Sequence, residues 1–337
     1  RGGRAALAAP PAELVMRFQL GPGEQRLVHL LDGRSLEEVR VASPLDAVHT
    51  DQVLAALRLY LRDATEGLAA GAEAAAAALD ALADRQGEVA LPGYTHMQPA
   101  MPSSVDLWAR GFAAEVRDDA AGLRQVLRRI ERNPLGSAAG YGTPGLAVSR
   151  ESTRAKLGFR EVQEPVTAVQ LSRGKAEAQL LFEVTLLMQD LGRLASDLLL
   201  FYTQEFGFVE LAPELTTGSS IMPQKRNADV LELVRARSAT ALACLVEALG
   251  VVSRLPSGYH RDLQLLKAPL FRGIDACAQV LGIVPVVLEG LRFLPDKIRL
   301  DAGLDAAARA NALAVGEGLP FREAYRRTAA ADAKLKG

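Results

Sequence analysis

The sequence is poor in cysteine, and this shortage excludes a class of protein. Only two of the 337 residues are cysteine, Cys244 and Cys277, and both lie within apolar helical patterns. Two such residues cannot supply the disulfide framework of a small secreted domain. They are typical of core residues in a protein from a reducing compartment.

Unbalanced charge and long apolar runs are lacking as well. The chain has 39 basic and 40 acidic residues, a net charge of -1 and a pI near 6.5. This balance excludes the basic footprint of nucleic-acid binding or of attachment to anionic membranes. No uninterrupted apolar run approaches a membrane span, and residues 1–9 imitate a signal peptide only weakly. We therefore expect a cytoplasmic protein without a nucleic-acid or membrane partner.

The spacing of metal and nucleotide sites is also missing. The four histidines, none of which pairs with another at i, i+4, are His29, His49, His96 and His260. With the two cysteines 33 residues apart, no metal site is expected. Residues 140–145 match G-x-G-x-x-G literally, but no strand pattern precedes them and Pro144 suits a loop better.

Long helices are the main structural signal. Aromatic residues make up only 5% of the chain while alanine and leucine abound, which favours helices over sheets. Apolar residues recur at helical spacing over residues 51–84, which corresponds to about 50 Å of helix. Further helices are predicted from Ser103 or Ser104 to residue 130 and over residues 172–206, 229–255 and 267–291. Five such helices predict an all-α, long-helix bundle.

This pattern predicts three parts along the chain. Residues 1–50 are interrupted by Pro and Gly and form an N-terminal segment with short helical stretches such as 24–31. Residues 51–298 form the central bundle with its loops, including an irregular connection over residues 133–170. Residues 299–337 form a small C-terminal helical domain.

The most informative stretch is Gly218–Asn227, which reads Gly-Ser-Ser-Ile-Met-Pro-Gln-Lys-Arg-Asn and leads into the fourth helix. A glycine and two serines leave the backbone loose and place hydroxyl groups on an exposed turn, and Pro223 prevents the helix from extending backwards. Lys225 and Asn227 add a cation and an amide near a helix start, where carboxylates bind favourably. Because an ordinary polar loop has the same composition, composition alone leaves the function open.

In this order the residues resemble the signature loop of the fumarase/aspartase superfamily, whose members release fumarate from succinyl compounds. The flanking residues 204–209 and 231–235 resemble argininosuccinate lyases in particular. The resemblance covers residues 51–325, and ten near-consecutive matches in one loop make it specific. It implies a central five-helix domain that assembles into the multi-helix core of a tetramer.

A second motif, Gly93–Pro102, places a histidine, an amide and a hydroxyl group between prolines. A stiff turn holds His96 in a defined direction, as general acid–base catalysis requires, although a single loop histidine is usually only solvated. The turn resembles the family's Thr-His-x-Gln motif, which implies that Thr95 and Gln98 bind substrate oxygens. Glu232 is a surface acid by position alone, but it matches the family's glutamate that hydrogen-bonds the histidine.

A third motif, Ser257–Lys267, is by composition an ordinary loop between helices. By resemblance, Tyr259, Gln264 and Lys267 hold the substrate at the rim of the active site. This motif separates argininosuccinate lyases from fumarases and aspartases better than the serine loop that all of them share. Residues 318–324 resemble the family's C-terminal segment and are not obviously catalytic.

The sequence departs from the family pattern in two places. Argininosuccinate lyases usually carry His-Thr-Gly-Arg-Ser-Arg-Asn, a loop that grips substrate carboxylates, where Thr50 here precedes Asp51 directly. Either the loop is absent, or the sequence closes over a segment that it does not include; the intact flanks favour the second. Arg226 and Ala228 replace the commoner Lys and Pro, a change that we expect to be mild.

The resemblance implies an anti elimination of L-argininosuccinate to L-arginine and fumarate without a cofactor. Ser219 is expected to be the base once the loop closes, while Lys225 and Asn227 stabilise the aci-type dianion. His96, oriented by Glu232, is expected on the acid side, a division of roles that the residues leave open. One alternative is another fumarate-releasing lyase, such as adenylosuccinate lyase or aspartase. The other is a non-catalytic, crystallin-like relative, which has no need of these residues.

The three motifs lie on separate connections between long helices. On antiparallel rods about 40 to 50 Å long, successive loops fall at opposite ends, so one chain cannot easily join all three. The wide apolar helix faces indicate burial against other subunits. The resemblance implies the same arrangement, a homotetramer whose active sites for argininosuccinate are shared between subunits.

Overall fold

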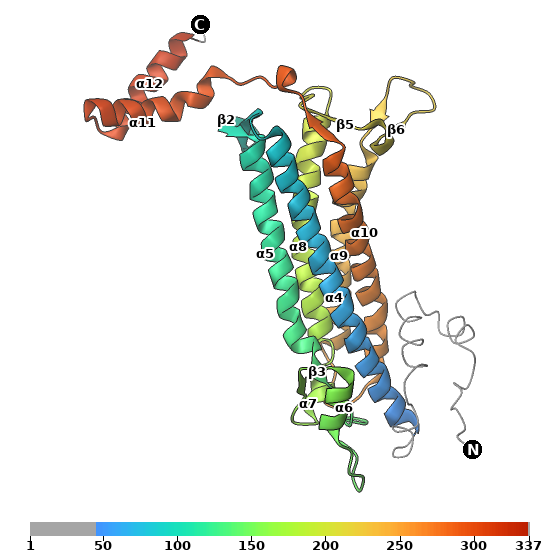
Figure 1. Ribbon diagram of the computed structural model, residues 1–337. Helices are drawn as coiled ribbons and strands as arrows, with labels where there is room; N and C mark the ends of the chain where they lie inside the picture. Colours follow the sequence, from blue (N-terminus) through green and yellow to red (C-terminus); the bar gives the residue numbers. More distant parts are fainter. Residues whose placement is uncertain (1–44, 336–337) are drawn as a thin grey trace. The chain divides into compact units, whose positions relative to one another are not determined.

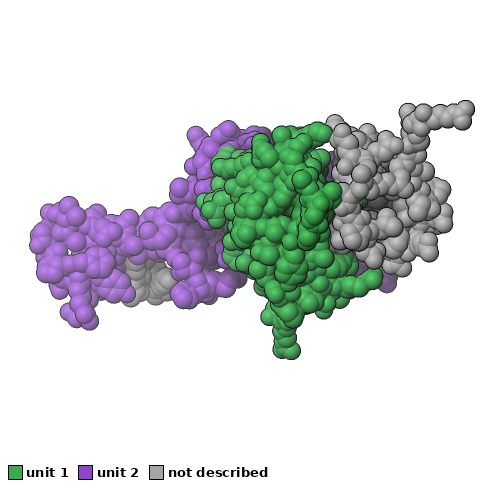
Figure 2. Space-filling model, turned by 90° about the horizontal axis from the view of Figure 1, so that it is seen from below, with its two compact units in different colours: residues 1–73, 117–192, 236–282 green, residues 74–116, 193–235, 283–337 purple. Residues whose placement is uncertain are grey.

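The computed structural model describes residues 45–335, and the chain forms two compact units that are coloured separately in Figure 2. Unit 1 combines the chain up to residue 73 with residues 117–192 and 236–282. Unit 2 combines residues 74–116 and 193–235 with the chain from residue 283 onward. Each long helix has residues in both units, so the predicted division into three consecutive parts stays a prediction. The N-terminal residues 1–44, with the expected helical stretch 24–31, lie outside the described residues.

Five long helices dominate the described residues (Figure 1). They are α4 (Leu45–Gln86), α5 (Val105–Ile130), α8 (Lys175–Tyr202), α9 (Asp229–Val252) and α10 (Lys267–Glu289). The prediction of an all-α, long-helix fold is confirmed, with ends that differ by a few residues. Helix α8 ends before the predicted residue 206 because the Thr203 hydroxyl accepts a hydrogen bond from the Phe206 N–H and Gly207 turns the backbone at φ 57°. Helix α4 runs without a break through Asp51, so the structure has no loop at that point.

In unit 1 the helices approach closely where small residues meet. A Cβ atom at Gly273 of α10 would lie 2.5 Å from Leu181 Cδ2 of α8 and 3.4 Å from Cys244 Cβ of α9, so a larger residue there would force the Leu181 side chain to shift. Cys244 and Cys277 are both free and buried, as predicted. Burial, with a smaller contribution from nearby Asp119, raises the pKa of the Cys277 thiol to about 12, which leaves it protonated and unreactive.

One helical stretch of the described chain, Arg261–Glu289, has the length and mean hydropathy of a membrane-spanning helix. Half of its most apolar window is buried inside the protein. The core helix of a bundle passes the same test, so the finding is weak evidence for a membrane span. The sequence analysis had not expected any segment to reach this hydropathy over such a length.

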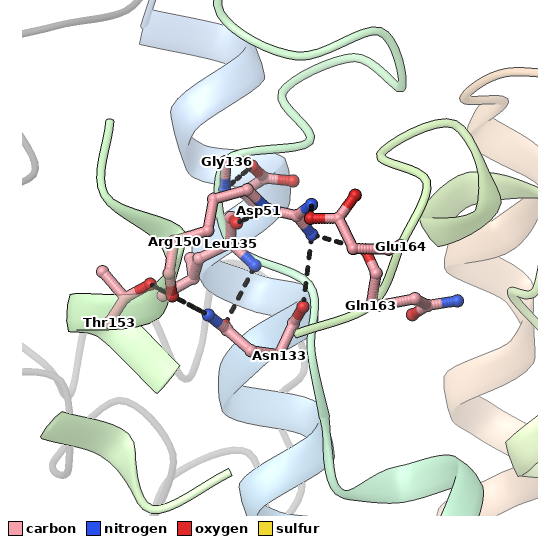
Figure 3. Close-up of polar contacts among 8 residues, drawn as sticks. All are labelled: Asp51, Asn133, Leu135, Gly136, Arg150, Thr153, Gln163 and Glu164. Carbon is pink, nitrogen blue, oxygen red and sulfur yellow. Dashed lines mark hydrogen bonds and ion pairs between the residues drawn. The ribbon is translucent and has the colours of Figure 1, made fainter. Parts of the chain in front are cut away.

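The connection between α5 and α8 is more regular than predicted. It contains the helices α6 (Arg150–Leu157) and α7 (Ala168–Leu171) and a parallel pair of strands, β3 (Arg132–Asn133) and β4 (Glu161–Val162). Figure 3 shows Arg150 at its centre. The Arg150 guanidinium donates hydrogen bonds to the carbonyl oxygens of Leu135 (2.9 Å) and Gln163 (2.8 Å). One half-buried side chain therefore ties the two ends of the connection together.

Asp51 of α4 fixes the start of the same connection. Its carboxylate accepts hydrogen bonds from the Gly136 N–H (3.0 Å), the Ser137 hydroxyl (2.6 Å) and the Ala138 N–H (2.7 Å). Asp51 is only 5% exposed, and burial raises the pKa of its carboxyl while these hydrogen bonds lower it. Asp51 lies inside α4 and clamps this loop to the helix.

We expect Asp51→Ala to lower the free energy of unfolding by about 3 kcal/mol, because two buried N–H groups and one hydroxyl lose their acceptor. Urea-induced unfolding followed by circular dichroism measures the change. Asp63→Ala is the matched control: Asp63 lies on the same helix, its side chain is 68% exposed, and it pairs only with neighbouring Arg62. The control should change stability by less than about 0.5 kcal/mol. Equal losses in the two variants would contradict the clamp.

Unit 2 contains three short antiparallel pairs that the sequence analysis missed. They are β1 (Ala90–Thr95) with β2 (Gln98–Ser104), β5 (Val209–Leu211) with β8 (Leu291–Phe293), and β6 (Thr217–Gly218) with β7 (Arg226–Asn227). An aromatic cluster holds this unit together. The Trp108 ring lies 6.0 Å from that of Phe201 and 5.7 Å from that of Phe293, and its indole N–H donates to Asp197 at 2.9 Å.

The chain after β8 is also helical. After the 3₁₀ turns Pro295–Lys297 and Ala302–Asp305, it consists of α11 (Ala306–Glu317) and α12 (Phe321–Leu335). Gly318 ends α11 in the left-handed conformation, at φ 63°, that a helix C-cap favours.

Candidate active site

The signature loop Gly218–Asn227 closes the β6–β7 hairpin. Thr217 pairs with Asn227 and Gly218 with Arg226, so Asn227 is fixed at the base of the loop, two residues before α9 begins. Lys225 donates its backbone N–H to the Met222 carbonyl at 3.0 Å, and its side chain is exposed. The local fold therefore delivers the predicted cation and amide beside a helix N-terminus, where an anionic group is favoured.

The Ser219 hydroxyl lies at the turn of this loop. Its oxygen accepts hydrogen bonds from the backbone N–H groups of Ile221 (3.3 Å) and Met222 (3.1 Å). Two donors directed at one hydroxyl oxygen stabilise negative charge on that oxygen, which suits a serine that acts as a base. Ile221 is 86% exposed at the tip of the loop, so an apolar side chain there has no cover within the described chain.

The His96 turn is a two-residue hairpin connection between β1 and β2. Thr95 pairs with Gln98, and the two residues between them, His96 and Met97, have φ angles of 52° and 61°. Two-residue hairpins favour positive φ at both central positions, where Asn and Gly are the usual residues. Each non-glycine residue in this conformation costs about 1 to 2 kcal/mol. The structure thus holds His96 at a strained, exposed tip, and strain of this kind is typical of functional sites.

Glu232 lies on the first turn of α9 and its side chain is exposed. Its backbone N–H donates to the Ala228 carbonyl at 3.4 Å. Among the described residues of one chain, the carboxylate forms no hydrogen bond with His96. The predicted Glu232–His96 pair is therefore not assembled within a single chain, and it stays a prediction for groups that come from different chains.

Residues of the third motif form a cluster of polar contacts in unit 1. Gln264, on the 3₁₀ turn Arg261–Leu266, donates its side-chain N–H to the Tyr259 hydroxyl at 3.0 Å. The Arg173 guanidinium lies over the Tyr259 ring, 5.8 Å from its centroid. Lys267 is the first residue of α10 and is half-buried. The structure therefore brings Tyr259 and Gln264 together, while their predicted contact with a substrate stays a prediction.

Comparisons with known proteins agree with these motifs. A family model described as lyase matches residues 37–242. The argininosuccinate lyase of Sorangium cellulosum is 45% identical over 335 residues, which cover 95% of this chain and 77% of that protein. The chain belongs to the argininosuccinate lyase family. The argininosuccinate lyase of Stenotrophomonas maltophilia is 44% identical over 311 residues, 89% of this chain and 71% of that protein.

The fold of this argininosuccinate lyase family member also matches solved structures. The crystal structure of EDDS lyase in complex with formate superposes with a TM-score of 0.77 at 22% identity. The match covers 97% of this chain and 70% of that one. At this identity the comparison supports the fold alone.

The predicted site residues of this family member are divided between the two units. The His96 turn, the Ser219 loop and Glu232 belong to unit 2, whereas Tyr259 and Gln264 belong to unit 1. No hydrogen bond or ion pair joins the His96 turn to the Ser219 loop among residues 45–335. Within the same range, no group of three or more His, Cys, Asp or Glu side chains is arranged to hold a metal ion.

One cavity lies elsewhere in unit 2. It has a volume of about 1240 Å³ and is lined by residues 83–89, 210–213 and 289–293, together with Asp106 and Pro295. None of the predicted site residues of the family lines it. Sequence reasoning also missed Arg173, which the sequence shows only as an arginine two residues before α8 begins at Lys175.

Proposed function

We propose that this protein converts L-argininosuccinate to L-arginine and fumarate by an anti elimination that uses no cofactor. Membership of the argininosuccinate lyase family supports the proposal, and one observation of the chain itself carries it. The Ser219 oxygen, in the family's signature loop, faces two backbone N–H donors (3.3 and 3.1 Å). Such a group can accept a proton when the loop closes on a substrate.

In the proposed reaction Ser219 removes the proton from the succinyl carbon next to a carboxylate. The electron pair passes into that carboxylate as an aci-type dianion, which Lys225 and Asn227 stabilise by charge and hydrogen bonding. The pair then forms the carbon–carbon double bond of fumarate while the bond to the guanidino nitrogen breaks. His96, oriented by Glu232, delivers the proton that this nitrogen needs to leave as arginine.

The remaining predicted residues bind the substrate in this proposal. Thr95 and Gln98 flank the His96 turn and contact the oxygens of the succinyl group. Tyr259 and Gln264, joined by their hydrogen bond, and Lys267 at the start of α10 contact the arginine end. The reaction needs only proton transfer and charge stabilisation, so no metal or organic cofactor has a part in it.

We further propose a cytoplasmic homotetramer with active sites shared between subunits. A 24-residue helix, α9, connects the signature loop to the third motif, and a helix of that length measures about 36 Å. Large apolar side chains are also exposed along α8 and α9, where another copy can cover them; they are Phe182, Leu186, Leu242, Val246 and Leu249. Assembly supplies both the missing cover and the missing neighbours of His96.

A substrate panel tests the proposed reaction. We expect fumarate, followed by its ultraviolet absorbance, to appear with argininosuccinate and at least about a hundredfold more slowly with adenylosuccinate, aspartate or malate. The physical reason is that Tyr259, Gln264 and Lys267 are placed to bind a group that the other substrates lack.

Each other outcome selects a different function. Release of fumarate from adenylosuccinate or aspartate alone would replace the substrate while retaining the superfamily chemistry. A folded oligomer that releases fumarate from none of the four compounds would support the crystallin-like, non-catalytic alternative.

A further inference from the structure

Arg173 is a buried cation with few partners. The residue is 7% exposed, and it lies between α7 and the start of α8. Its Nε donor has no hydrogen-bond partner among the described residues. Burial lowers the pKa of the guanidinium, and the charge of Glu177 acts in the opposite direction. A side chain that is so costly to bury needs a compensating interaction.

The charge of Glu177 supplies part of that interaction, and the ring of Tyr259 supplies a further part. The guanidinium carbon of Arg173 is 5.8 Å from the ring centroid, within the range of a cation–π contact. Glu177, which is 4% exposed, accepts a hydrogen bond from the Gly174 N–H at 2.9 Å and therefore anchors the backbone next to Arg173. The backbone beside Arg173 is thus held in place, and the guanidinium lies over the face of the Tyr259 ring.

Tyr259 is held at two further points. Gln264 donates to its hydroxyl oxygen at 3.0 Å. The preceding residue, Gly258, has a φ of 95°, and a Cβ atom there would lie 3.6 Å from the Tyr141 hydroxyl, so the backbone is packed against a neighbouring loop. The hydroxyl group of Tyr259 and the backbone before it are thus held in place, and Arg173 lies over the ring.

We propose that Arg173 is a positioning residue that fixes the Tyr259–Gln264 pair for binding of the substrate's arginine end, through the face of the Tyr259 ring and without touching the substrate itself. This inference rests on the proposed function, in which that pair binds substrate. Binding that is equal in the ground state and the transition state affects KM and leaves kcat unchanged. Loss of Arg173 should therefore act on KM.

A double-mutant cycle tests this role. We expect Arg173→Met and Tyr259→Leu each to raise KM for argininosuccinate by about tenfold with kcat within about threefold of the wild type. The KM of the double variant should be no higher than that of the poorer single variant, because each change already removes the contact between Arg173 and the Tyr259 ring. Arg150→Met is the control, since the described contacts of this half-buried arginine are all with residues other than Tyr259. It should lower the melting temperature and combine additively with Tyr259→Leu.

A graded change of the ring separates the cation–π contact from a general packing role. Phenylalanine and its mono-, di- and trifluorinated forms at position 259 progressively weaken the negative face of the ring. KM should rise stepwise along this series with Arg173 present and stay flat in Arg173→Met. Arg173→Lys, which keeps the charge and loses the planar group, should give an intermediate KM. A flat series with Arg173 present, or additive effects in the cycle, would overturn the role.

The melting temperature gives a second readout that needs no substrate. Along the fluorinated series it should fall stepwise with Arg173 present and stay constant in Arg173→Met or Arg173→Gln, whichever of these two neutral variants folds. If argininosuccinate proves not to be the substrate, this thermal coupling still shows whether Arg173 holds the ring. Absence of coupling in a protein that does turn over argininosuccinate would reject the positioning role alone.

Discussion

Replacing Ser219 by alanine is expected to lower kcat by at least about a hundredfold, the usual contribution of a positioned acid–base group. The Ser219 oxygen is the proton acceptor in the proposed reaction, and its two N–H donors stabilise the charge that it must carry. Alanine removes that oxygen and leaves the β6–β7 pairing intact. Fumarate release at saturating argininosuccinate measures kcat, and circular dichroism should show an unchanged fold.

Ser220→Ala provides a matched control. Ser220 is the neighbouring serine on the same loop, it is exposed, and it forms no hydrogen bond with a described residue. Its replacement should keep kcat within about threefold of the wild type, as for most surface changes. A nearly normal Ser219→Ala variant together with an inactive Ser220→Ala variant would show that Ser220, and not Ser219, is the base.

The five long helices could be predicted because their signal is distributed over many residues. Apolar side chains at helical spacing continue for more than twenty residues in each, and errors at the ends average out. The β1–β2 hairpin was missed because Pro92, Pro99 and Pro102 were interpreted as breaks between helices. Prolines are compatible with an isolated two-stranded hairpin, where half of the backbone N–H groups have no partner strand.

The pairing of β5 with β8 had no sequence signal at all. Each strand has three residues, and Leu211 and its partner Leu291 are separated along the chain by α9 and α10. Such a pairing depends on where the long helices bring their ends, which no local pattern encodes. Tertiary placement, and not local propensity, therefore decided this part of unit 2.

The site was predictable to the extent that its residues occur in recognisable order. Ser219, Lys225 and Asn227 stand in one loop and His96 in one turn, so a linear motif identified them. Arg173 is different, because a lone arginine before a helix is usually solvated. Only its burial and its position over Tyr259 distinguish it, and both are properties of the folded chain.

Shared active sites lead to the second large expected effect, the recovery of activity from two inactive variants. In the proposed homotetramer, His96 and Ser219 of one active site come from different chains. In a random 1:1 mixture of Ser219→Ala and His96→Asn subunits, about one quarter of the sites then receive an intact serine and an intact histidine. We expect the mixture to approach a quarter of wild-type activity after subunit exchange, while each variant alone stays nearly inactive.

A mixture of Ser219→Ala with Lys225→Met is the control for this experiment. Both residues lie on the same β6–β7 loop, so every site receives one lesion or the other, and no mixture restores activity. Static light scattering, with a labelled subunit to demonstrate exchange, confirms that the mixed tetramers have formed. Recovery in the control would mean that the variants are only partly inactive.

The first mixture distinguishes sharply between the two possible geometries of the site. If His96 and Ser219 of one chain served the same site, every site in the mixture would carry one lesion, and activity would stay at the level of the single variants. The structure favours the other geometry: no described hydrogen bond or ion pair joins the two loops within a chain, and the exposed Glu232 and Ile221 have no cover there. A mixture that stays inactive after demonstrated exchange, or an active monomer, would contradict the shared site.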